Sequence, residues 1–129
     1  MSQRKLTLSI LQDIFAICKL DKDTRVPNWA LTGSFLSITR TLEELSIVCP
    51  QDKIPEGTPC DRGWRCLKVE GPFDLSVGGI VASFSEPLAR ASISILVTST
   101  FDTDYVMVKE EDIKKAVSVL SREGHSIRR

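Results

Sequence analysis

A polar corner between two apolar segments holds the side chains of this sequence that are best suited to chemistry. The corner, TSTFDTD, contains the hydroxyls of Thr98 and Thr100 and the carboxylates of Asp102 and Asp104. Hydroxyls and carboxylates on rigid elements are the partners that a small zwitterionic or cationic molecule needs. Neither a third acidic ligand nor a histidine is close by, so a metal site is not favoured. The corner therefore predicts a small-molecule site or, because aspartate commonly initiates turns, a purely structural turn.

The remaining reactive side chains form no recognisable catalytic set. His125 follows a glycine near the chain end, and we expect it on the surface without a partner. Four cysteines occur singly, with no CxxC pair, and are expected to be small buried hydrophobes with inert thiols: Cys18, Cys49, Cys60 and Cys66. The glycine pattern GPFDLSVGG has the spacing of neither a dinucleotide fingerprint nor a phosphate loop. We therefore predict neither a catalytic residue nor a cofactor.

The charge balance restricts the classes of partner. The 129 residues include 17 basic and 17 acidic side chains, which give zero formal net charge. Nucleic-acid and anionic-membrane binding normally require a basic excess, so neither partner is expected. The N-terminal apolar run is interrupted at Gln12 and Asp13 before it reaches the length of a signal core, and no segment approaches a membrane span. We expect a cytoplasmic protein.

An internal repeat indicates which elements position the corner. The segment ITRTLEELSIVCPQDKI from Ile38 lies over VTSTFDTDYVMVKEEDI from Val97 when the later copy has one extra residue in its corner. Thr41 then aligns with Thr100, and Leu42 aligns with Phe101. The chain is accordingly predicted to be two copies of one unit, a first domain at 1–62 and a second at 63–129.

The second copy is predicted to run strand, helix, strand, strand, helix, strand. Strand 64–71 alternates, apolar positions over 75–91 recur at helical spacing, and strands 92–100 and 105–109 are followed by a helix over 110–122 and a closing strand. This order is the ferredoxin-like βαββαβ unit, an α+β fold with an antiparallel sheet covered by helices on one side. Gly78 and Gly79 inside the first helical pattern indicate either tight helix packing or close approach of a backbone or ligand.

The first copy is predicted to be degenerate. LTLSILQDIFAICKL supplies its strand or strand pair, and VPNWALTG has room for only a short helical turn. QDKIPEGTPCDRG is too rich in proline and glycine for a full second helix. Strand WRCLKV lies near the predicted boundary, where it can serve both sheets.

The stretches VEGPFDLSVGGIVASFSEPLARA and ASISILVTSTFDTDYVMVKEED together resemble the ACT-domain superfamily, including the ACT modules of animal cytosolic arginine sensors. The resemblance is strong from Trp64 to His125 and looser before it. It implies a regulatory, non-catalytic module that binds an amino acid at a domain or subunit interface, and a homodimer. The sensors use four modules whereas this chain has two, so such a site requires dimerisation or has been lost.

The resemblance also implies ligand-binding positions. In the arginine sensors a serine and the next residue early in the second strand contact the ligand's main-chain groups, and an aspartate at the corner meets its cationic end. The complete predicted ligand-binding set is Asp74, Leu75, Ser94, Ile95, Thr98, Thr100, Phe101 and Asp104. A structural or protein-interaction domain with an empty pocket is the alternative. A small enzyme with a corner aspartate as general base has little support, because no partner residue is found for it.

Overall fold

The chain divides into two compact units in a computed structural model that describes residues 4–73 and 78–129. Unit 1 combines the chain up to Leu11 with Arg65–Arg129, and unit 2 comprises Gln12–Trp64. The sequence placed a single division between residues 62 and 63. The later division falls two residues further on, whereas the residues up to Leu11 group with the second half of the chain and not with the first.

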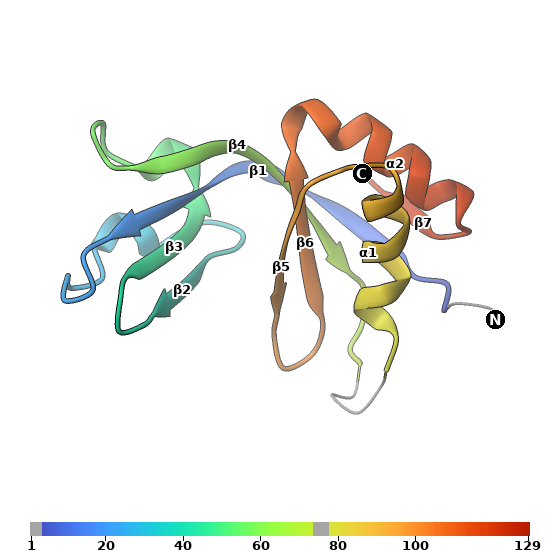
Figure 1. Ribbon diagram of the computed structural model, residues 1–129, viewed down its shortest axis with the longest axis horizontal. Coiled ribbons are helices and arrows are strands. Elements are labelled where there is room, and N and C mark those ends of the chain that lie inside the picture. The colour runs from blue at the N-terminus through green and yellow to red at the C-terminus, as the bar shows by residue number, and fades with distance from the viewer. Residues whose placement is uncertain (1–3, 74–77) are drawn as a thin grey trace. The chain divides into compact units, whose positions relative to one another are not determined.

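Unit 1 is an α+β unit with a predominantly antiparallel sheet and two α-helices (Figure 1). It contains the start of β1 (Thr7–Leu20), the second half of β4 (Cys60–Val69), and then α1 (Ile80–Arg90), β5 (Ile95–Ser99), β6 (Asp104–Lys109), the short helix η3 (Glu110–Asp112), α2 (Ile113–Arg122) and β7 (Ser126–Arg128). The strand order is β7-β1-β4-β6-β5. The element order predicted from strand 64–71 onward is confirmed.

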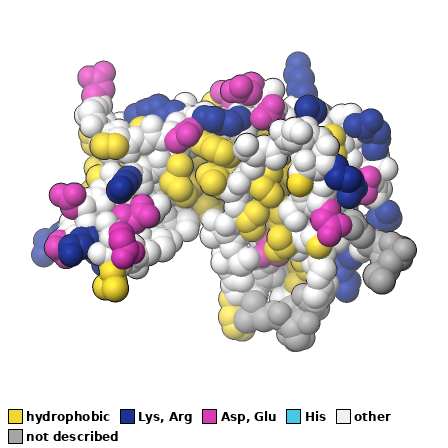
Figure 2. All heavy atoms as spheres, in the orientation of Figure 1, with side chains coloured by type: hydrophobic (Ala, Val, Ile, Leu, Met, Phe, Trp, Pro, Cys, Tyr) yellow, Lys and Arg dark blue, Asp and Glu magenta, His cyan; other side chains and the backbone are white. Residues whose placement is uncertain are grey.

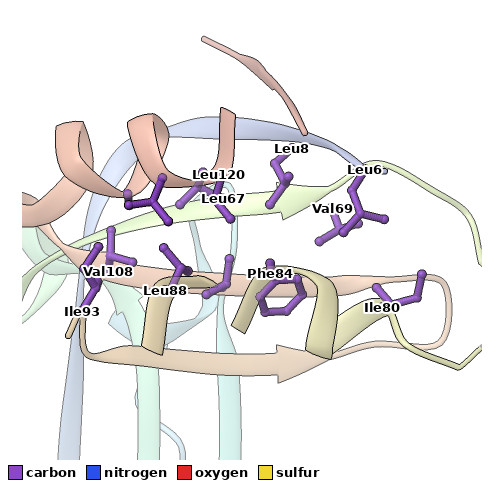
Figure 3. Close-up of a cluster of buried hydrophobic side chains, with 13 residues drawn as sticks. Leu6, Leu8, Leu67, Val69, Ile80, Phe84, Leu88, Ile93, Val108 and Leu120 are labelled. Carbon is purple, nitrogen blue, oxygen red and sulfur yellow. The ribbon is translucent and has the colours of Figure 1, made fainter. Parts of the chain in front are cut away.

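The first strand of the chain is an integral part of this sheet. Thr7 and Leu8 at the start of β1 pair in parallel with Ser126 and Ile127 of β7. Leu8 is also fully buried in the core that α1 and α2 form against the sheet, together with Phe84 and Leu120 (Figure 3). Pairing and burial together explain why the residues before Gln12 belong to unit 1.

Helix α1 begins later than the sequence indicated. Its N-cap is Gly79, with a left-handed φ of +82° that glycine adopts without a steric penalty. Gly78 and Gly79 thus lie before the helix and not inside it, which corrects the predicted start at Leu75. Residues 74–77 lie outside the described residues.

His125 is buried, contrary to the prediction of a surface position. Its side chain is 5% exposed, and its Nδ1 accepts a hydrogen bond of 3.0 Å from the Leu6 amide. Its Nε2 lies 2.9 Å from the Ser83 carbonyl oxygen. That carbonyl is four residues before Pro87, which has no N–H to continue the α1 ladder. His125 therefore supplies the donor that Pro87 cannot, in the tautomer with its proton on Nε2.

Unit 2 contains strands but, among its residues, only short 3₁₀ helices. The elements are the rest of β1, η1 (Asn28–Leu31), β2 (Ser37–Arg40), β3 (Leu45–Pro50), η2 (Gln51–Lys53) and the start of β4, in the order β2-β3-β1-β4. The predicted short helical turn is η1, and η2 has only three residues, so the prediction that no full second helix forms is confirmed. β1 and β4 each run from one unit into the other.

The cysteines are mostly buried, as predicted. Cys18, Cys49 and Cys66 are buried, and Cys60 is half-buried. Burial raises the pKa of the Cys66 thiol to about 12, so at neutral pH it is a small apolar group. No helix within residues 4–73 and 78–129 is long and apolar enough to cross a membrane.

Candidate functional site

The polar corner is the turn between β5 and β6, and a threonine closes it. The Thr100 amide donates to the Thr103 carbonyl over 2.8 Å, and the Thr100 hydroxyl accepts from the Thr103 amide over 3.3 Å. The turn between β2 and β3 is closed in the same way, because the Thr41 amide donates to the Glu44 carbonyl and its hydroxyl accepts from the Glu44 amide. Thr41 and Thr100, which the sequence repeat aligns, thus close their turns through the same hydrogen bonds.

Two hydrogen bonds attach the β5–β6 turn to the segment that follows β4. The Thr103 hydroxyl donates to the Val69 carbonyl over 2.6 Å, and the Phe73 amide donates to the Asp102 carbonyl over 2.6 Å. A Cβ at Gly71 would lie 3.0 Å from the Phe73 nitrogen and 3.2 Å from the Asp102 oxygen, so only glycine fits there without a shift. The turn and residues 69–73 are therefore held as one assembly.

This assembly encloses a cavity of about 180 Å³. It is lined by Lys68, Glu70, Gly71, Pro72, Asp102 and Thr103. The Glu70 carboxylate accepts a hydrogen bond of 2.7 Å from the Ser9 hydroxyl of β1, which fixes its orientation. The lining contains one ammonium and two carboxylates, a combination that complements a small molecule carrying both charges.

Sequence reasoning missed Lys68 and Glu70. Both belong to the WRCLKVEG segment, in which Leu67 and Val69 are buried in the helix-covered core. Because side chains alternate along a strand, Lys68 lies on the opposite face, and Glu70 continues this alternation just beyond the strand end. This alternation was visible in the sequence. The approach of the β5–β6 turn, which contains Asp102, to the end of β4 was not.

The structure places Asp104 and Thr98 on opposite faces of the sheet. Asp104 pairs with Ser99, whose hydroxyl donates to the Asp104 carboxylate. Asp104 lies two residues before Val106 in β6, so both side chains are on the same face, and Val106 is buried against the helices. Thr98 pairs with Tyr105, and these two side chains are on the other face. Figures 1 and 3 show the first residues of α1 at the same end of unit 1 as the β5–β6 turn.

Ser94 and Ile95 of the predicted set lie away from this end of the sheet. Ile95 pairs with Val108, four residues along β5 from Ser99, which corresponds to about 13 Å at about 3.3 Å per residue. Ser94 lies exposed just before the strand, and Phe101 at the turn tip is 79% exposed. Asp74 and Leu75 lie outside the described residues. The assignment of these residues to one ligand remains a prediction.

The surroundings of the turn do not resemble a metal centre. Within the part of the chain that the structure describes, no group of three or more His, Cys, Asp or Glu side chains is arranged to hold a metal ion. Cationic and anionic side chains are interspersed over the face drawn in Figure 2. The functional groups of this site are thus charged side chains of both signs beside a hydrogen-bonded turn.

Comparison with known proteins connects this geometry to a family. Residues 60–122 match the model of the ACT domain, and residues 13–57 match that of a second family described as an N-terminal domain. The crystal structure of protein Atu0741 from Agobacterium tumefaciens is 43% identical, covers 96% of this chain and 92% of its own, and superposes with a TM-score of 0.91. The regulatory subunit of aspartate kinase from Thermus flavus shares the fold at 11% identity, with 94% and 99% coverage and a TM-score of 0.65.

More distant similarity connects the chain to animal proteins. The cytosolic arginine sensor for mTORC1 subunit 1 of Bos taurus is 29% identical over 100 residues, which are 69% of this chain and 30% of that protein. The chain thus spans about a third of the length of this relative. From the family match, the similarity to Atu0741 and the two-helix α+β fold of unit 1, the chain belongs to the ACT-domain family and is a distant relative of the arginine sensors.

Proposed function

We propose that this protein is a non-catalytic, cytoplasmic regulatory module that binds a free amino acid at the end of the unit 1 sheet. The observation that carries the proposal is the cavity at the β5–β6 turn, where Lys68, Glu70 and Asp102 present both signs of charge on a fixed backbone. ACT modules bind small ligands, most often amino acids, and the arginine sensors are by name amino-acid-binding relatives.

The chemistry of the cavity matches an amino acid group by group. Lys68 can donate to an α-carboxylate, while Glu70 and Asp102 can accept from an α-ammonium and from a cationic side chain. Because carboxylates outnumber ammonium groups in the lining, a cationic amino acid is favoured over a neutral one. At about 180 Å³ the cavity is smaller than the roughly 300–1,000 Å³ of drug-sized sites, which suits a ligand of this size.

Asp102 and Asp104 are competing candidates for the partner of the ligand's cationic end. The resemblance to the arginine sensors favours Asp104, whereas the cavity lining contains Asp102. Since Asp104 lies on the helix-covered face, the two positions correspond to ligands on opposite faces of the sheet. Separate substitutions therefore distinguish the two sites.

Calorimetry with arginine and lysine on the whole chain tests the proposal. For the cavity site, Asp102 is exposed and Lys68 is half-buried, so Asp102→Asn and Lys68→Gln should each weaken binding by about 1 kcal/mol, the upper end for a solvent-exposed charge pair. Asp104→Asn is the matched control, equal in charge change and two residues away. A loss confined to Asp104→Asn would move the ligand to the helix-covered face, and no binding by the wild type would refute the proposal.

A structural domain without a ligand is the second candidate, and one observation favours it. The hydroxyls of Thr100 and Thr103 are both engaged within the turn and its attachment to β4, so the corner has a folding role that needs no ligand. A thermal-shift screen of the twenty amino acids separates the candidates. A shift with a subset of amino acids supports the sensor, and none with any supports the structural domain.

We also infer that unit 2 is a reduced copy of the same module, so that the chain is a tandem duplication with a degenerate first copy. The shared closure of the Thr41 and Thr100 turns supports this inference. Each turn joins two neighbouring antiparallel strands, β2 with β3 and β5 with β6. Helices comparable to α1 and α2 do not occur in the residues of unit 2.

A further inference from the structure

Three of the four cysteines gather in one part of unit 2. Ala16 of β1 pairs with Cys49 of β3, and Cys18 lies two residues further along β1 on the same face. Cys18 and Cys49 belong to the buried core of unit 2, and Cys60 at the start of β4 packs against that core. The thiols of Cys49 and Cys60 are close enough to Cys18 to contribute to the raised pKa of its thiol.

The strand register places Cys18 directly opposite Cys60. β4 runs antiparallel to β1, because Lys19 donates to the Pro59 carbonyl over 3.1 Å while Glu70 at the other end donates to Thr7. Along two antiparallel strands, residue pairs with and without backbone hydrogen bonds alternate. Because Lys19 and Pro59 form a hydrogen-bonded pair, the next pair, Cys18 and Cys60, face each other without backbone hydrogen bonds. In such a pair the Cα atoms are about 4.5 Å apart, within the 4.4–6.8 Å that a disulfide spans.

The same geometry disfavours Cys49 as the partner of Cys18. These two residues are diagonal neighbours, and diagonal neighbours are about 7–8 Å apart, beyond the roughly 4.4–6.8 Å between the Cα atoms of a disulfide. Cys49 is also buried, whereas Cys60 is half-buried. A cavity of about 300 Å³ lined by both Cys18 and Cys60 gives a small reagent access to this pair.

We propose that Cys18 and Cys60 are an oxidisable dithiol that closes to a cross-strand disulfide with a low-molecular-weight disulfide such as oxidised glutathione. The Cys60 thiolate attacks one sulfur of the reagent, forms a mixed disulfide and releases one thiol. The Cys18 thiolate then attacks the Cys60 sulfur, closes the protein disulfide and releases the second thiol. The protein loses two electrons and two protons, and the reagent gains both.

The surroundings of Cys18 set the rate of the closing step. Burial, with smaller contributions from the Cys49 and Cys60 thiols, raises the Cys18 pKa to about 12, and Arg62 opposes this only weakly. The nucleophile is the thiolate, so its fraction increases about tenfold per pH unit below that pKa. Closure should therefore accelerate from pH 7 to pH 9, and the mixed disulfide at Cys60 should accumulate at the lower pH.

The test treats the folded whole chain with oxidised glutathione, alkylates the remaining thiols and maps disulfide-linked peptides by mass spectrometry. Free thiols should fall from four to two, with a Cys18–Cys60 link that a thiol reductant reverses. Cys49→Ser is the matched control and should still form the link, whereas Cys60→Ser should not.

A Cys18→Ala chain should stop at the glutathione adduct on Cys60. If that variant fails to fold by circular dichroism, the contrast between Cys49→Ser and Cys60→Ser decides the question alone. A Cys18–Cys49 link, a stable adduct without a link in the wild type at pH 9, or four unchanged thiols would each overturn the proposal.

Discussion

At the scale of single residues, His125 shows how a local sequence pattern and a long-range contact differ. Its neighbours Gly124 and Ser126 are typical of an exposed chain end, and this led to the surface prediction. Its partners are Leu6, 119 positions away, and Ser83, 42 positions away. Neither periodicity nor a turn rule predicts such long-range hydrogen bonds. The sequence does show that Pro87 has no N–H, so that the Ser83 carbonyl needs a donor from elsewhere.

We predict that His125→Ala lowers the free energy of unfolding by about 2–6 kcal/mol, because the Leu6 amide and the Ser83 carbonyl lose their buried partner at about 1–3 kcal/mol each. Urea unfolding of the whole chain is the measurement. Pro87→Ala should soften the loss in the double variant, since the restored amide can donate to Ser83. Strictly additive losses would contradict the assigned link between His125 and Pro87.

At the scale of elements, the sequence predicted the order of strands and helices because periodicity and turn residues are local. The two α-helices, β5, β6 and β7 all occur in the predicted order, with ends that differ by a few residues from the predicted ones. The start of α1 was placed too early because apolar spacing continues through Val77, whereas the φ of Gly79 sets the N-cap. None of the six described residues in the predicted ligand-binding set lines the cavity, because the cavity depends on the β5–β6 turn meeting the end of β4.

The β5–β6 turn should depend on Thr103 more than the β2–β3 turn depends on Thr41. Thr103 is 8% exposed and its hydroxyl serves the Val69 carbonyl, so Thr103→Val should cost about 1–3 kcal/mol through an unsatisfied buried acceptor. Thr41 is exposed, and Thr41→Val should cost less than about 1 kcal/mol. Denaturant midpoints of the two variants provide the comparison, and equal losses would argue against the attachment of the turn to β4.

At the scale of the whole molecule, the division into units differs from the simple halving that the repeat indicated. The pairing of β1 with β7 groups the residues up to Leu11 with Arg65–Arg129. Sequence similarity between the two copies contains no information on this pairing. The domains 1–62 and 63–129 remain a prediction.

Leu8→Ala should destabilise unit 1 by about 2–5 kcal/mol, the usual cost of deleting a buried leucine side chain, although Leu8 is far from residues 65–129 in sequence. Leu42→Ala is the matched control, because Leu42 is 86% exposed and its loss should cost about 0.5 kcal/mol or less. Hydrogen exchange of the α1 and α2 amides checks the assignment. Faster exchange in these helices is expected for Leu8→Ala alone, and unchanged exchange would place Leu8 outside their core.

The homodimer remains a prediction, and β5 is the strand expected to carry it. β5 ends the strand order, so one side of its backbone has no strand partner among the described residues, and such edges are commonly paired or covered. Light scattering should give about twice the chain mass of 14.3 kDa. Val97 pairs with Val106 at a position without hydrogen bonds between β5 and β6, so the Val97 amide points away from β6. Val97→Pro therefore removes an amide from the free edge of the sheet and leaves the β5–β6 hydrogen bonds in place. The variant should be a monomer with intact helices. A wild-type monomer at high concentration would contradict the prediction.

The central claim is that the end of the unit 1 sheet binds an amino acid. The most direct measurement is the amide chemical-shift map of the ¹⁵N-labelled chain during titration with arginine and, separately, with each other amino acid. We predict saturable shifts that concentrate at residues 68–73 and 100–104, largest for a cationic amino acid and reduced in Lys68→Gln. The absence of saturable shifts with all twenty amino acids, or shifts confined to residues far from these two segments, would contradict the claim.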